Sequence, residues 1–206
     1  DAAVQDKYNK NNISDNIPIS AALSVEDVED VKVGQSAIVK IHVNLNATGD
    51  VKLIFKGVES TVEITNGDGT ALLGDLSEGT YSVEVRFMGD SNYGAKNVTK
   101  TFSVSKYDVS LDNLIVDVPD NGNPSFNIEL ESDVTGNFTV NIDNVDYFES
   151  ISSGKATVTI PNLAPGKYSA IVGYSGDNKY KSTSRNVNFT VKVDCGLDAN
   201  VNNILS

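Results

Sequence analysis

The sequence has one cysteine, no tryptophan and a single histidine. One cysteine, Cys195, cannot form an internal disulfide, so the fold has to be stabilised by burial of apolar side chains. The histidine, His42, alternates with Ile41 and Val43, and we expect it on the solvent side of a strand. No catalytic triad can be assembled around it. The protein is therefore predicted not to be an enzyme.

Basic residues are also scarce. The chain has 16 lysines and arginines against 28 aspartates and glutamates, which gives a formal charge of −12 at pH 7. A surface with this excess of negative charge repels phosphate backbones and anionic membranes. Nucleic acid is therefore excluded as a partner, and this segment is expected to make no membrane contact.

Long apolar runs are missing as well. No stretch of about 18 apolar residues is present that could form a membrane-spanning helix. The start of the chain, DAAVQDKYNK, lacks the basic and apolar regions of a signal peptide. The protein is thus either cytosolic or a piece of a longer exported chain. With 39% hydrophobic residues among 206, it can form one large or two ordinary domains.

What the sequence does contain is an internal repeat. The stretch LSEGTYSVEVRFMGDSNY (76–93) has a counterpart 87 positions further along, LAPGKYSAIVGYSGDNKY (163–180). The same offset aligns Thr48-Gly49 with Thr135-Gly136 without a gap. Two homologous modules therefore follow each other directly.

Both ends of the chain match the interior of the repeat. Residues 8–20 align with residues 93–105, the last strand of a module, and residues 192–201 align with residues 106–115, the first strand. The chain is therefore predicted to be a segment of a longer array, in which Cys195 is a core residue of a third module. The predicted parts are the end of a preceding repeat or an N-terminal extension (1–20), domain 1 (21–106), domain 2 (107–193), and the start of a following repeat or a C-terminal tail (194–206).

The aligned segments alternate between apolar and polar residues, which predicts strands that bury one face. Gly-bearing turns such as NATGD and TNGDGT separate these segments at a spacing of roughly 8–12 residues, typical of a sandwich. Because each strand has one apolar face, two antiparallel sheets must bury these faces against each other. The predicted fold class is all-β, with two tandem antiparallel β-sandwich domains.

The repeated stretch predicts a corner followed by a hairpin. A Leu precedes a Gly-containing turn, and Tyr81 or Tyr168 then begins an alternating strand, which resembles the tyrosine corner of immunoglobulin-like folds. In such a corner the ring packs inward and the hydroxyl bonds to the upstream backbone. The Gly-Asp-x-x-Tyr that follows predicts a hairpin in which Gly tolerates a positive φ and Asp accepts backbone N–H bonds. The residues expected in the core after the two tyrosines are Val83, Val85 and Phe87 in the first module and Ala170, Val172 and Tyr174 in the second.

These motifs, together with the closing F-[ST]-V at 102–104 and 189–191, are similar to the bacterial and archaeal Ig-like repeats of surface adhesin-like proteins, which are numerous in methanogenic archaea. The resemblance covers residues 21–193. It implies tandem immunoglobulin-like domains in an extracellular, cell-surface protein, acting as a stalk or spacer and in cell adhesion. The segment would be monomeric, and its partner would be a glycan or protein on a neighbouring cell.

The second hypothesis is a glycan- or protein-binding module that uses loops at one end of a sandwich, or a sheet face. Glycan sites generally need exposed aromatic rings, and most tyrosines and phenylalanines here fall on core positions. Tyr147 and Phe148 differ, because adjacent strand residues point to opposite faces and one ring is then exposed. They lie in a loop-like stretch, NVDYFESISSG, and are the candidate ligand-binding residues.

Two kinds of side chain could carry additional groups. Neither acidic cluster contains the D-x-[DN]-x-[DN]-G loop, so no cofactor is expected, and calcium at a module junction is the alternative. The sequons either reflect an Asn- and Thr-rich composition or carry glycans after export. The acidic residues are Glu26, Asp27, Glu29, Asp30, Asp112, Asp117 and Asp120. The sequons are at Asn12, Asn46, Asn97, Asn137 and, least favourably within a strand, Asn188.

Overall fold

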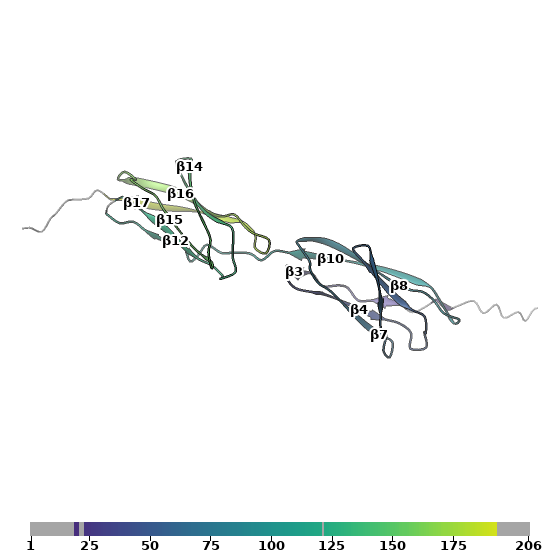
Figure 1. Ribbon diagram of the computed structural model, residues 1–206. Helices are drawn as coiled ribbons and strands as arrows, with labels where there is room; N and C mark the ends of the chain where they lie inside the picture. Colours follow the sequence, from purple (N-terminus) through teal and green to yellow (C-terminus); the bar gives the residue numbers. More distant parts are fainter. Residues whose placement is uncertain (1–18, 21–22, 121, 193–206) are drawn as a thin grey trace, which may run out of the picture. The chain divides into compact units, whose positions relative to one another are not determined.

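The computed structural model describes residues 19–20, 23–120 and 122–192 (Figure 1). The chain divides into two compact units, Asp1–Ser105 and Lys106–Ser206, each with its own hydrophobic core. In the described part of the chain, every regular element is a strand, and no helix is present that could cross a membrane. The predictions for residues 1–18, residues 194–206 and Cys195 lie outside the described residues.

The first unit packs a three-stranded sheet against a five-stranded sheet. A short parallel pair joins β1 (Ile19–Ser20) to β9 (Tyr93–Gly94). The three-stranded sheet is antiparallel and has the order β2 (Ser24–Val25), β4 (Ala37–His42) and β7 (Asp68–Leu73). The five-stranded sheet has the order β3 (Val31–Lys32), β10 (Lys96–Ser105), β8 (Gly79–Phe87), β5 (Val51–Phe55) and β6 (Val58–Val62), with β3 parallel to β10.

The second unit repeats the two facing sheets with one strand fewer in the described residues, because β3 has no counterpart there, and an isolated bridge between Tyr107 and Tyr180 stands where the first unit has the β1–β9 pair. Since both units place two sheets face to face with equivalent antiparallel strands in the same order, the predicted all-β fold of two tandem immunoglobulin-like sandwiches is confirmed. One sheet has the order β11 (Ile115–Asp117), β12 (Ser125–Glu129) and β15 (Lys155–Thr159). The other has the order β14 (Val145–Ser150), β13 (Asn137–Ile142), β16 (Gly166–Tyr174) and β17 (Thr183–Val191).

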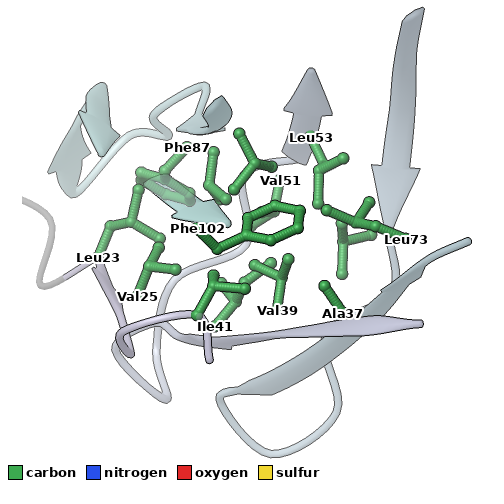
Figure 2. Close-up of a cluster of buried hydrophobic side chains, with 14 of the residues drawn as sticks. Leu23, Val25, Ala37, Val39, Ile41, Val51, Leu53, Leu73, Phe87 and Phe102 are labelled. Atoms are coloured by element: carbon green, nitrogen blue, oxygen red, sulfur yellow. The ribbon is translucent and has the colours of Figure 1, made fainter. Parts of the chain in front are cut away.

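Strand alternation places the cores where the sequence predicts them. In β4, Val39 and Ile41 are fully buried while Lys40 between them is exposed. Figure 2 shows these aliphatic side chains packed around the rings of Phe87 and Phe102. The core residues expected after the two corner tyrosines are all buried, which confirms that prediction. These residues are Val83, Val85, Phe87, Ala170, Val172 and Tyr174.

Candidate functional site

The two corner tyrosines occupy the same position in their units. The Tyr81 hydroxyl donates to the carbonyl of Ser77 (3.0 Å), and the Tyr168 hydroxyl donates to that of Ala164 (2.8 Å). Each ring is half-buried and stacks on a phenylalanine of the last strand, Phe102 or Phe189, at 5.6 Å between centroids. Each tyrosine therefore joins the turn before its strand to the core beneath.

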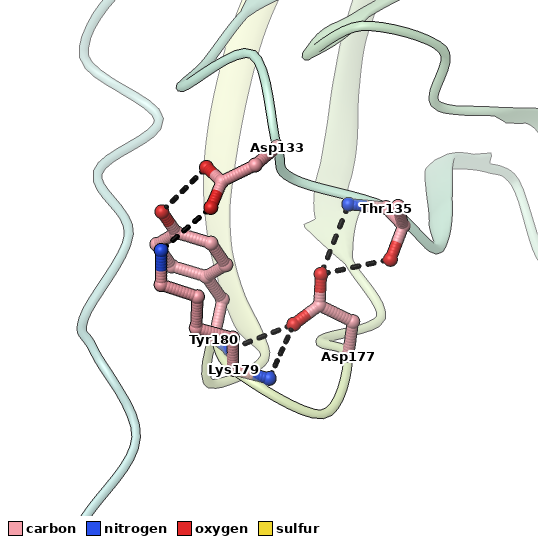
Figure 3. A network of polar contacts seen from close by, with 5 residues as sticks. All are labelled: Asp133, Thr135, Asp177, Lys179 and Tyr180. Atoms are coloured by element: carbon pink, nitrogen blue, oxygen red, sulfur yellow. Dashed lines mark hydrogen bonds and ion pairs between the residues drawn. The ribbon is translucent and has the colours of Figure 1, made fainter. Parts of the chain in front are cut away.

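The aspartate of Gly-Asp-x-x-Tyr ties the hairpin to a second loop. In the second unit, Asp177 accepts bonds from the backbone N–H and hydroxyl of Thr135 (2.9 Å each) and from the N–H groups of Lys179 (2.8 Å) and Tyr180 (2.7 Å), as Figure 3 shows. Burial by itself would raise the pKa of Asp177, but these bonds outweigh it and lower the pKa to about 2. In the first unit, the N–H of Thr48 (2.7 Å) is the largest cause that lowers the pKa of Asp90 to about 2.

Two glycines allow these loops to meet. A Cβ on Gly49 would lie 2.3 Å from the carbonyl oxygen of Gly89, and one on Gly136 would lie 2.8 Å from that of Gly176. The Thr-Gly and Gly-Asp pairs are therefore the two halves of one contact, built once in each unit. The sequence comparison aligned both pairs at the same offset, but it did not predict that they touch.

Replacing Asp177 by asparagine is expected to destabilise the second unit by about 1–2 kcal/mol at pH 7. Asparagine keeps one acceptor oxygen, but its NH₂ group replaces the second oxygen and would face hydrogen-bond donors. The Asp177 pKa is lowered, so the stabilisation is present above pH 3.8 and is lost as the pH falls toward about 2. Urea unfolding at pH 7 and pH 2 measures this. Asp143→Asn, at an exposed turn residue, is the control; an equal loss in both variants contradicts the prediction.

A second network holds the hairpin of the second unit (Figure 3). Asp133 accepts bonds from Lys179 Nζ (2.5 Å) and the Tyr180 hydroxyl (2.8 Å). The lysine cation also lies 5.1 Å from the Tyr180 ring centroid and 5.3 Å from that of Tyr107. Lys179, followed by Tyr180, lowers the pKa of Asp133, while Asp133 raises the pKa of Lys179. Both groups stay ionised at neutral pH, so the pair is suited to holding the loop and not to proton transfer.

His42 lies at the outer surface of β4 between two carboxylates. Its Nδ1 is 2.7 Å from Asp68 Oδ1 and its Nε2 is 3.0 Å from Glu26 Oε1. These hydrogen bonds, first that to Glu26 and then that to Asp68, raise the pKa of His42 above 6.5. The partly exposed position agrees with the sequence analysis, which did not predict the two carboxylates.

The first unit is expected to lose stability as the pH rises above about 6.5, the ordinary pKa of histidine. Because the folded-state pKa of His42 is raised, its stabilisation is fully present below the unfolded value and is lost as the pH rises through the folded one. Urea unfolding between pH 6 and pH 8 measures the slope. The slope should vanish in His42→Asn, and the second unit, which has no histidine, is the internal control. A slope that persists in His42→Asn contradicts the assignment.

Several of the acidic residues considered for calcium have other partners. Asp27 lies 2.6 Å from Lys100 Nζ, and Asp30 accepts the Ser103 N–H at 2.6 Å. Within the described ranges, no cluster of three or more histidine, cysteine or acidic side chains is arranged to hold a metal ion. The absence of a cofactor, with calcium at a module junction as the alternative, stays a prediction.

The described sequon asparagines are all exposed. Asn97 donates its side-chain amide to Glu84 (3.1 Å), and Asn188 lies within β17. Asn12 lies outside the described residues, so its accessibility stays a prediction. The other two exposed sequon asparagines are Asn46 and Asn137.

The candidate ligand-binding pair lies on a strand, so the loop expected around it is wrong. Tyr147 and Phe148 belong to β14, which pairs with β13 on one side and forms the edge of its sheet. Tyr147 packs half-buried against the core opposite Val140, whereas Phe148 is 67% exposed opposite Thr139. One ring is therefore exposed, as expected for adjacent strand residues. Their role in binding stays a prediction.

Neither a family model nor a curated protein matches this sequence. Among solved structures, it is similar to the fibronectin(III)-like modules of Clostridium thermocellum CbhA, with 12% identity, a TM-score of 0.35, and coverage of 83% of this chain and 94% of that chain. A putative membrane anchored protein from Corynebacterium diphtheriae gives 14% identity and a TM-score of 0.35, with coverage of 84% of this chain and 59% of that chain. The chicken CNTN1 FN1–FN3 domains give 11% identity and a TM-score of 0.32, with coverage of 85% of this chain and 67% of that chain. At TM-scores below 0.5 these likenesses carry no argument, and the fold class rests on the strand order.

Proposed function

We propose that this chain is a non-enzymatic segment of an extracellular, cell-surface adhesin-like protein, in which tandem immunoglobulin-like modules act as a stalk or spacer. The observation that supports this proposal most is that the two modules are built in the same way. The same strand order, the same tyrosine corner and the same contact between two loops occur in both modules at an offset of 87 residues. A repeated unit whose retained residues serve folding is suited to extending a chain by addition of copies.

The strand pairing of each module also suits a load-bearing role. The last strands, β10 and β17, each pair with the preceding long strand over nine residue positions. In antiparallel sheets the hydrogen bonds run perpendicular to the strands, so a pull along the last strand loads many bonds at once. At the other end of the second module, Tyr107 exchanges two backbone bonds of 2.9 Å with Lys179 and Lys181. A pulling force applied at Tyr107 is therefore transmitted to the hairpin that Asp177 stabilises.

The surface chemistry is compatible with export. Neither module depends on a disulfide, because each has a continuous core of buried aliphatic and aromatic residues. The exposed sequon asparagines at positions 46, 97 and 137 are accessible to a glycosylation enzyme. The resemblance to repeats that are numerous in methanogenic archaea supports the same assignment.

Intact cells that produce the full-length protein provide the test of location. An antibody raised against this segment should label them without permeabilisation, and external protease should remove the signal. Labelling that requires lysis would contradict the proposal.

A spacer replacement tests the mechanical role. Exchanging the segment for two unrelated immunoglobulin-like domains should retain cell adhesion, whereas deleting it should reduce adhesion. If the unrelated spacer fails while the native segment succeeds, the segment acts through its own surface and the stalk proposal is wrong.

A further inference from the structure

The outer face of the β14-β13-β16-β17 sheet carries an exposed ring among side chains that are uncharged except for one carboxylate, that of Asp146. Cross-strand pairing places Phe148, Thr139, Gly173 and Ser184 in one row across the four strands. The neighbouring row consists of Asp146, Asn141, Ile171 and Asn186. These side chains point away from the core, because the alternate residues of β13 and β16 are buried. We refer to the two rows together as the neutral face.

Within its row, the aromatic ring of Phe148 has only small neighbours. Phe148 is 67% exposed, and the next residues in its row have a hydroxyl or no side chain. Gly173 is held close to its neighbour, since the Thr139 hydroxyl donates to its carbonyl (3.3 Å) and a Cβ there would lie 2.8 Å from Thr139 Oγ1. No large side chain therefore flanks the ring within the row.

The first module shows that the fold does not require this surface. At the equivalent row, 87 positions earlier, stand Thr61, Lys52, Arg86 and Asn97, paired in the same register. Lys52 donates to the Thr61 hydroxyl (2.6 Å), and Arg86 makes two bonds of 2.9 Å to Glu84. The row of the first module thus carries two cations with hydrogen-bond partners on the same sheet, whereas the equivalent row of the second module carries a ring and small uncharged residues.

The chemistry of the neutral face indicates its ligand. An exposed aromatic face can stack on the apolar C–H face of a pyranose, and hydroxyl and amide side chains can exchange hydrogen bonds with sugar hydroxyls. The two rows contain no cation, the carboxylate of Asp146 accepts a bond from Asn141 (2.6 Å), and the chain carries a charge of −12, so an anionic glycan is disfavoured. One ring and one isoleucine are too small an apolar centre for a stable protein interface.

From this geometry we propose that the neutral face binds an uncharged polysaccharide, with Phe148 stacked on one sugar ring and Thr139, Ser184 and Asn186 bonded to its hydroxyls. The strands lie about 4.7–4.9 Å apart, close to the width of a sugar ring, so consecutive residues of a linear glycan can follow the row. The proposal goes beyond the stalk function and is tested on the isolated chain.

Affinity electrophoresis of the purified 206-residue chain provides the test. Native gels cast with the neutral polysaccharides laminarin, mannan, xylan or hydroxyethyl cellulose are compared with gels containing anionic polygalacturonate. At least one neutral gel should retard the protein. Phe148→Ala should weaken that association at least about tenfold, the order expected for loss of one aromatic stacking contact. Ser184→Arg, which introduces the size and charge found on the first module, should also weaken it.

Matched controls separate binding from folding. Thr61→Ala, at the equivalent position of the first module, should leave retardation unchanged, and thermal unfolding of Phe148→Ala should match that of the unmodified chain because the ring is exposed. The proposal is overturned if no neutral gel retards the protein, if retardation survives Phe148→Ala, or if polygalacturonate alone retards it. Each of these results leaves the stalk proposal standing, since the spacer replacement is judged by adhesion alone.

Discussion

Phe126→Ala is expected to lower the free energy of unfolding of the second module by about 3–5 kcal/mol and to leave the first module unchanged. The Phe126 side chain is fully buried, and its ring meets that of Phe189 edge-on at 5.4 Å between centroids. Its removal leaves a cavity that rigid strands on both sides cannot fill. The buried cluster around it contains residues of the second unit, whereas the first unit has a separate cluster.

Differential scanning calorimetry should therefore resolve two transitions in Phe126→Ala, with one shifted to lower temperature. Phe148→Ala is a matched control, because it removes the same side chain from a 67% exposed site in the same module and should leave both transitions in place. A common shift of both modules in Phe126→Ala would mean that they unfold as one cooperative unit, contrary to the prediction.

Gly49→Ala is expected to destabilise the first module by about 3 kcal/mol. The new methyl group would lie 2.3 Å from the carbonyl oxygen of Gly89 and 2.9 Å from the Phe87 ring. Because the nearest atom belongs to the backbone, the hairpin has to move. Its movement separates Asp90 from Thr48 N–H, so the clash and the lost hydrogen bond add to each other.

Urea unfolding of the first module measures this effect. Gly74→Ala is the control, since the nearest atom to a Cβ there is the Ser36 hydroxyl at 3.6 Å. The control should unfold close to the unmodified midpoint. A normal midpoint in Gly49→Ala would show that the two loops do not approach each other as closely as described.

The fold was accessible from the sequence because its determinants are local or repeated. Alternation along residues 81–87 specifies which side chains enter the core, and one turn and one tyrosine specify the corner. Contacts between loops are different. Thr48 and Asp90 meet because β5 and β8 are neighbours in the sheet, and sheet order is not encoded in either segment alone.

The sequence predicts a loop where the edge strand β14 lies, and the difference has a physical reason. It pairs on one side only, and Tyr147 is its one residue packed against the core cluster, so its burial pattern lacks the alternation of a central strand. The partners of His42 were missed for a related reason. Asp68 lies opposite it through the register of β4 with β7, which depends on residues distant in the chain.

The attachment of Tyr107 to the hairpin of the second module bears on how such a protein can be divided. Tyr107 bonds to Lys179 and Lys181 before the first sheet strand of its module begins at Ile115. The sequence predicts the first strand at residues 106–115, but the strand begins only at Ile115, and Tyr107 ahead of it is already bonded into the domain. A recombinant domain trimmed back to its first sheet strand would leave an N–H and a carbonyl on the hairpin without their partners, so an autonomous unit has to include Tyr107.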